Sequence, residues 1–213
     1  MESASAAVHD HEHHGPAPAN RSSRVDPQFL GMYLFIISEI MLFGAFFTAY
    51  FFMRVVKGDP WPAPGTEIPV LVAGVNTAIL LSSSVTMHWA LVSAKRDNRR
   101  GMTLGLVFTL IMGLTFLALQ VREYNLLHGE GFTPEHGAFA SVFFGLTGLH
   151  GIHVLVGAIL LAIALVRTLR GHYSPAKHMG LELSGIYWHF VDVVWVVLYT
   201  LVYLLSNGAR ASL

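Results

Sequence analysis

The chain of 213 residues contains no cysteine and few charged residues. The absence of cysteine excludes disulfide bonds, thiolate metal ligands and cysteine nucleophiles. Charged residues make up only 12% of the chain, and its 13 basic and 13 acidic residues leave a formal net charge of zero. A balanced charge without a basic face argues against nucleic-acid binding. The N-terminal tail is acidic, rich in histidine and contains proline, which is unlike a secretory signal peptide.

What the chain has in abundance is long apolar stretches, since 54% of its residues are hydrophobic. Five stretches are long enough to cross a bilayer, at 29–53, 70–92, 101–121, 137–166 and 183–206. They predict an all-α membrane protein built as a bundle of five transmembrane helices. Residues 1–28 are predicted to form a disordered tail, and residues 207–213 a short C-terminal tail.

The basic residues near the ends of these stretches predict the orientation of the chain. One side of a five-span protein carries nine of them, namely Arg21, Arg24, Lys95, Arg96, Arg99, Arg100, Arg167, Arg170 and Lys177. The other side carries four, namely Arg54, Lys57, Arg122 and Arg210. Because basic residues concentrate on the cytoplasmic side, we expect the N-terminus inside and the C-terminus outside.

Ionisable residues occur inside the predicted spans, where they are costly and mark contacts or function. His189 and Asp192 lie three residues apart in the last span and therefore share a helix face. Glu39 lies about ten residues into the first span. It is interpreted either as a neutral carboxyl bonded to a neighbouring helix or as a proton-responsive group. The two interpretations are compatible.

The intramembrane histidines allow two interpretations. His150 and His153 share one helix face, a spacing that suits two ligands of one metal ion but not the two axial ligands of one haem. His88 and His189 lie nearer the inner ends of their spans and fit haem ligation better. The commoner case is a histidine that hydrogen-bonds across helices, and it is favoured here. The tail cluster of His9, His11, His13 and His14 is interpreted as a solvated segment, with weak metal capture as the alternative.

Five motifs, in order, carry a resemblance to a known family. They are Phe35 to Glu39, Asn76 to Ser83, Gln120 to Tyr124, Thr147 to Gly157, and Tyr187 to Trp195. Over about residues 29–206 the chain resembles subunit III of the haem–copper respiratory oxidases, in the five-span bacterial form.

The resemblance implies a function that the residues alone do not. It implies a redox-silent subunit of a proton-pumping terminal oxidase that reduces dioxygen to water, with no cofactor in this chain and with haem and copper in partner subunits. The implied partners are oxidase subunit I, other oxidase subunits and phospholipids, with membership of a respiratory supercomplex left open. The implied location is the bacterial plasma (inner) membrane. Cytochrome c oxidase is the favoured subtype, and a quinol oxidase or a nitric-oxide-reductase accessory protein remains open.

The resemblance also assigns roles to residues. Glu39 matches the carbodiimide-reactive carboxyl of the family. Arg167, Arg170 and His172 match a phospholipid site, although positive-inside topology also accounts for basic residues there. The remaining polar positions are predicted to form a structural polar core: His88, His150, His153, Glu182, His189, Asp192 and Glu123. No catalytic residue and no metal ligand is predicted.

The rival class is an autonomous transporter or channel. Such proteins build a substrate path from broken helices or internal repeats. The sequence shows no internal repeat, and its intramembrane polar residues are few and scattered. Both features argue against this class.

Overall fold

The computed structural model describes residues 26–57, 61, 70–175 and 178–206, except for the side chain of His136. The predicted disordered segment and C-terminal tail, including the four tail histidines, fall almost entirely outside these residues. Within them the chain forms five long helices: α1 (Pro27–Lys57), α2 (Val70–Lys95), α3 (Arg99–Gly129), α4 (Ala138–Leu169) and α5 (Met179–Leu198). A short 3-10 turn, η2 (Pro134–His136), precedes α4, and a π-helical segment, η3 (Tyr199–Leu204), continues α5.

All five helices are long and apolar enough to cross a membrane, which confirms the predicted all-α bundle of five spans. The ends differ from expectation mainly in α3, which runs to Gly129 instead of residue 121. The extra turns persist because Glu123 and Leu127, at 3% and 4% exposure, keep this segment packed inside the protein. A helix of 32 residues such as α4 is about 48 Å long and exceeds the apolar core of a bilayer.

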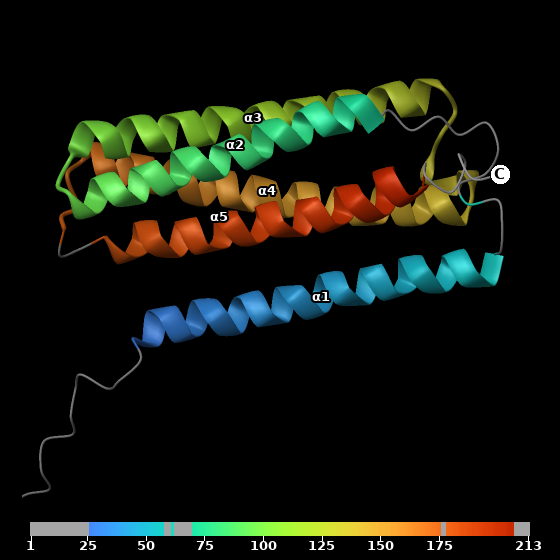
Figure 1. Cartoon of the computed structure of the whole chain (residues 1–213), viewed down its shortest axis with the longest axis horizontal. Helices are drawn as coiled ribbons and strands as arrows, with labels where there is room; N and C mark the ends of the chain where they lie inside the picture. The colour runs from blue at the N-terminus through green and yellow to red at the C-terminus, as the bar shows by residue number, and fades with distance from the viewer. Residues whose placement is uncertain (1–25, 58–60, 62–69, 176–177, 207–213) are drawn as a thin grey trace, which may run out of the picture.

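Helices α2 to α5 form a ring in which each helix packs against the next, and α5 closes it against α2 (Figure 1). Helix α1 lies outside this ring and contacts α4 and α5. The α2–α3 and α4–α5 connections and the start of α1 lie at the same end of the bundle (Figure 1). Most basic residues of the described chain therefore gather at that end.

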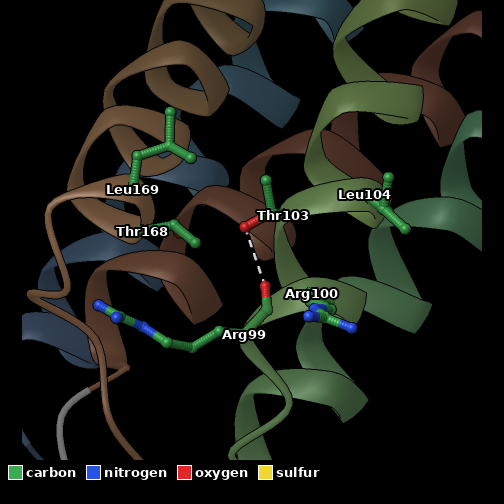
Figure 2. Close-up of a pocket in the computed structure, with 6 residues that line it drawn as sticks. All are labelled: Arg99, Arg100, Thr103, Leu104, Thr168 and Leu169. Atoms are coloured by element: carbon green, nitrogen blue, oxygen red, sulfur yellow. Dashed lines mark hydrogen bonds between the residues drawn. The ribbon is translucent and has the colours of Figure 1, made fainter.

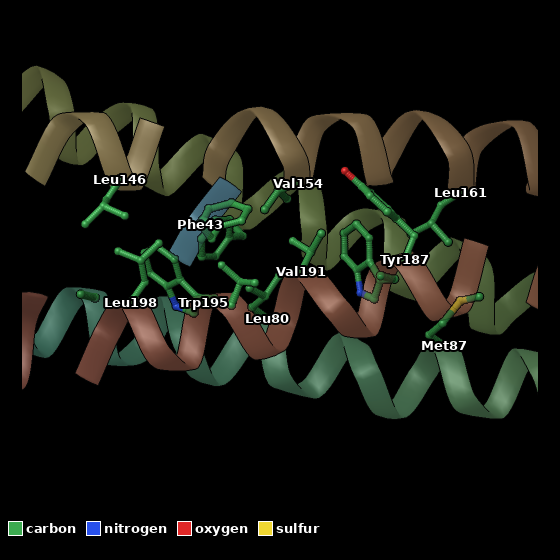
Figure 3. Packing of buried hydrophobic residues seen from close by; sticks show 14 of the residues in the cluster. Phe43, Leu80, Met87, Leu146, Val154, Leu161, Tyr187, Val191, Trp195 and Leu198 are labelled. Carbon is green, nitrogen blue, oxygen red and sulfur yellow. The ribbon is translucent and has the colours of Figure 1, made fainter. Parts of the chain in front are cut away.

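Large aromatic side chains fill the centre of the ring. Trp188 and Trp195 of α5 are completely buried, and Phe116 of α3 meets Trp195 edge-on with ring centroids 4.8 Å apart. Figure 3 shows Trp195 among aliphatic side chains of α2, α4 and α5. Each indole N–H donates to a hydroxyl on α2, Trp188 to Ser83 and Trp195 to Thr77, both at 2.9 Å. These bonds remove the cost of an unpaired polar group and set the α2–α5 register.

The glycines of α4 differ in how closely other side chains approach them. Of those at 145, 148, 151 and 157, only Gly157 is tightly packed, because a Cβ there would lie 2.9 Å from Trp188. Gly151 has nothing within 4 Å. Tight positions outside α4 include Gly105, against α2, and Gly113, where a Cβ would lie 2.5 Å from Trp188. Trp188 therefore leaves no room for a side chain at Gly113 on α3 or at Gly157 on α4.

Candidate functional site: polar contacts between the helices

The most informative polar contact joins α1 to α4. The Glu39 Oε2 atom lies 2.8 Å from His153 Nε2, and the two side chains are only 15% and 11% exposed. The other ring nitrogen, His153 Nδ1, lies 2.8 Å from the carbonyl oxygen of Leu149. A carbonyl oxygen only accepts hydrogen bonds, so Nδ1 carries a hydrogen.

This geometry places one proton between Glu39 and His153. If Nε2 is unprotonated, Glu39 is a neutral acid that donates to it, and if Nε2 is protonated, a Glu39 carboxylate can accept from it. Either arrangement leaves the pair with no net charge, which avoids a bare charge within the membrane. The pair can therefore hold a proton and shift it between two atoms without changing its charge.

Aromatic groups enclose this pair. The ring of Phe43 lies 4.9 Å from the His153 imidazole, centroid to centroid. Tyr187 of α5 donates a hydrogen bond of 3.3 Å to the backbone carbonyl of His153, and its ring stacks on Phe35 at 6.0 Å. The proton-sharing pair thus sits where α1, α4 and α5 meet.

His150, one turn away on α4, has a different environment. Its side chain is completely buried and lies between Trp195, at 4.9 Å, and the edge of Phe116, at 5.8 Å. Neither ring nitrogen has a hydrogen-bond partner among the described residues. The two α4 histidines therefore do not act on one shared group: His153 uses both nitrogens in hydrogen bonds, while His150 packs as an aromatic ring.

A second polar chain joins α2 to α5. Ser84 bonds to Asp192 Oδ2, and its Oγ lies 2.9 Å from His189 Nδ1. Asp192 is buried, whereas His189 is half-buried and His88 is exposed on the neighbouring turn of α2. Ser84 links the two predicted α5 residues and was not predicted. The only signal for it is the run of serines at 82–84, of which the sequence does not say which one faces α5.

Glu123 belongs to a third contact near the other end of the ring. It accepts a hydrogen bond of 2.8 Å from the buried Tyr203 hydroxyl, and the neighbouring Tyr124 hydroxyl lies 2.6 Å from Thr147 Oγ1. Trp188 and Tyr203 are fully buried inside the bundle.

The residues predicted to bind phospholipid lie at the basic end of the bundle, and all three are exposed. The Arg167 guanidinium sits 5.3 Å from the ring centroid of Tyr173, in a cation–π contact. Burial raises the pKa of the Tyr173 hydroxyl, and the nearby Arg167 charge partly opposes this. Glu182, also at this end, pairs with Lys95 at 3.1 Å and with His178 at 3.2 Å.

An open cavity of about 450 Å³ lies beside these residues, between α3 and α4 (Figure 2). It is lined by Arg99, Arg100, Thr103, Leu104, Thr168 and Leu169. None of the predicted lipid residues lines this cavity, although Arg167 directly precedes Thr168 in α4.

Among the described residues, no three histidine or acidic side chains come together in a group that could hold a metal ion. His153 and His189 form hydrogen bonds, and His150 packs between aromatic rings.

Comparison with known proteins gives the family. The model of the family "Cytochrome c oxidase subunit III" matches residues 20–207. A cytochrome c oxidase subunit 3 from Thermostichus vulcanus is 41% identical over 199 residues, covering 93% of this chain and 92% of the relative. The Synechocystis sp. protein of the same name is 42% identical over 197 residues, covering 92% and 79%. The Drosophila melanogaster protein is 43% identical over 183 residues, covering 81% and 67%. With its five spans and a match along most of its length, this chain belongs to the cytochrome c oxidase subunit III family.

Proposed function

We propose that this chain is the redox-silent subunit of a bacterial cytochrome c oxidase, in which partner subunits hold the haem and copper. Membership of the family makes it part of an oxidase complex and a multi-pass membrane protein. The relatives' names favour cytochrome c as the electron donor over a quinol. The redox-silent role is supported by the intramembrane histidines, because His153 and His189 bond to protein groups and His150 is enclosed by aromatic rings.

The observation that carries the functional proposal is the 2.8 Å contact between Glu39 Oε2 and His153 Nε2. A neutral pair that can move a proton between two atoms suits a chain that supports proton uptake by oxidase subunit I. Its position on α1 also suits this role, because α1 lies outside the ring of the other four helices (Figure 1). We propose that the pair keeps proton supply to subunit I intact and slows its inactivation during turnover.

Two further parts of the proposal concern the membrane. We place the basic end of the bundle on the cytoplasmic side of a bacterial plasma membrane, because basic residues concentrate on the cytoplasmic side of membrane proteins. We also assign Arg167, Arg170 and His172 to the headgroup of an anionic phospholipid. Their exposure at the end of α4 leaves them accessible to such a headgroup.

Purification of the native complex through an affinity tag on this chain tests the proposal. We expect oxidase subunit I and other oxidase subunits to co-purify, with a visible spectrum of haem and with oxygen consumption driven by reduced cytochrome c. The chain separated from its partners should contain no stoichiometric haem or copper. Oxygen consumption driven by quinol alone would overturn the assigned donor, and a chain that purifies as a homo-oligomer with transport activity would overturn the class.

A further inference from the structure

A polar strip on the outer side of the α2–α5 contact is not explained by the role of Glu39. It consists of His88 and Ser84 on α2 and His189 on α5, and we call it the α2–α5 strip. His88 is exposed, while Ser84 and His189 are half-buried. Behind the strip, the buried Asp192 is bonded to Ser84. Helices α2 and α5 lie side by side along this strip (Figure 1).

The strip lies within the apolar depth of the membrane. Helix α2 has 26 residues, or about 39 Å at about 1.5 Å per residue, against an apolar bilayer core of about 30 Å. His88 is about 10 Å from the Lys95 end of α2, so it lies inside that core. His189 is about 15 Å from the start of α5, and Ser84 is at a similar depth.

The outer surface at comparable depth is mostly apolar elsewhere, and exposed hydroxyls such as Ser38 and Thr115 bond to a carbonyl of their own helix. On α3, the exposed side chains include Leu104, Phe108, Ile111 and Leu114. Histidines in a membrane span face a bundle interior, a partner or water, and seldom lipid. Within the described part of the chain, no hydrogen bond satisfies either ring nitrogen of His88 or the Nε2 atom of His189. The strip therefore differs from a lipid-facing surface in both composition and unmet hydrogen bonds.

The hydrogen bonds of the strip indicate what its partner must offer. When Ser84 donates to Asp192, its oxygen accepts from His189 Nδ1–H, which leaves Nε2 of a neutral His189 as an acceptor. If His189 is protonated, Nε2 is a donor instead. A carboxyl group satisfies both states, as Glu39 does for His153, and a hydroxyl group also satisfies both.

We propose that the α2–α5 strip is a docking surface for a transmembrane helix of another oxidase subunit, which presents a carboxyl or hydroxyl group to His189 and His88. This inference rests on the proposed function, because the partner is a subunit of the same oxidase. The partner helix covers the two histidines and completes their hydrogen bonds. The apolar side chains beside them, such as Val85 at 70% exposure, pack against the same helix.

Site-specific photo-crosslinking in native membranes tests the inference. A photoreactive residue replaces Val85, one turn from His88, so that both histidines stay in place. The matched control replaces Ile111 on α3, which is 54% exposed and lies on a different face. We expect position 85 to crosslink to another oxidase subunit and position 111 to crosslink to lipid. Crosslinking of position 85 to lipid alone, or to a second copy of this chain, would overturn the inference, as would equal crosslinking of both positions to one subunit.

The variant His88→Leu gives a second measurement, for which a lipid-facing surface and a docking surface predict opposite results. On a lipid-facing surface, leucine would leave retention of this chain in the complex unchanged or increase it. On a docking surface, loss of one hydrogen bond should lower the retained fraction about five- to tenfold under dissociating detergent. Co-purification distinguishes failure of the docking surface from failure of the proposed function. An active complex whose position 85 crosslinks only to lipid refutes the docking surface and leaves the function intact, whereas failure to co-purify with oxidase subunits refutes both.

Discussion

Two variants of Glu39 distinguish the role of its proton from the role of its hydrogen bond to His153. Glu39→Gln keeps a donor that can bond to His153 Nε2 at the observed 2.8 Å, but it cannot release a proton. Glu39→Ala removes both the bond and the proton. A comparison of the two variants therefore distinguishes a structural contact from a proton-holding group.

The expected cost to stability is modest. Glu39→Ala leaves the nearly buried His153 Nε2 without a partner, which costs about 1–3 kcal/mol. Helix α1 keeps its other attachments, including the Tyr50 hydroxyl, which lies 2.8 Å from Ser206 Oγ and donates to the Leu201 carbonyl. We therefore expect both variants to assemble into the complex, with α1 held less firmly in the alanine variant.

The assay follows oxygen consumption and proton uptake of the purified complex during prolonged turnover. We expect both variants to lose carbodiimide labelling at position 39 and to inactivate sooner than the unmodified protein, because neither can hold the shared proton. The outcome that would refute this reasoning is a Glu39→Gln complex with normal proton uptake and a normal active lifetime. In that case the pair only attaches α1 to α4.

The remaining predictions concern packing, orientation and lipid. Gly113→Ala should destabilise the bundle by about 1–3 kcal/mol, because its Cβ would lie 2.5 Å from Trp188, whereas Gly151→Ala, with open space around it, should be neutral or slightly stabilising in thermal unfolding. A reporter that is active only outside the inner membrane should give signal when fused to Leu213 and none when fused to the N-terminus; the reverse pattern would invert the orientation. The double change of Arg167 and Arg170 to Ala should reduce anionic lipid retained by the complex, measured by mass spectrometry, since each basic group contributes about 1 kcal/mol near an anionic surface. Unchanged lipid content would leave these arginines only a topological role.

The amino-acid sequence by itself determined the fold class. Each of the five spans is a long apolar stretch. Unpaired backbone groups are costly in lipid, so a segment that crosses the membrane must form either a helix or a strand of a closed barrel, and stretches of this length form helices. Glu39, His189 and Asp192 also stood out from sequence alone, because ionisable residues are rare in membrane spans. The ordered motifs led to the family, which the comparisons confirm.

The tertiary structure decided which polar residues meet. Glu39 and His153 are 114 residues apart, and no local pattern relates positions on two separate helices. Ser84 was missed because three adjacent serines point in different directions, and only the rotation of α2 against α5 selects the one that bonds to Asp192. The same rotation leaves His88 exposed, whereas the packing of α4 against α3 and α5 encloses His150, equally polar in sequence, between the rings of Phe116 and Trp195. Apolar length is a local property that one segment carries alone, whereas the partner of a buried polar group depends on how helices pack, which involves the whole bundle at once.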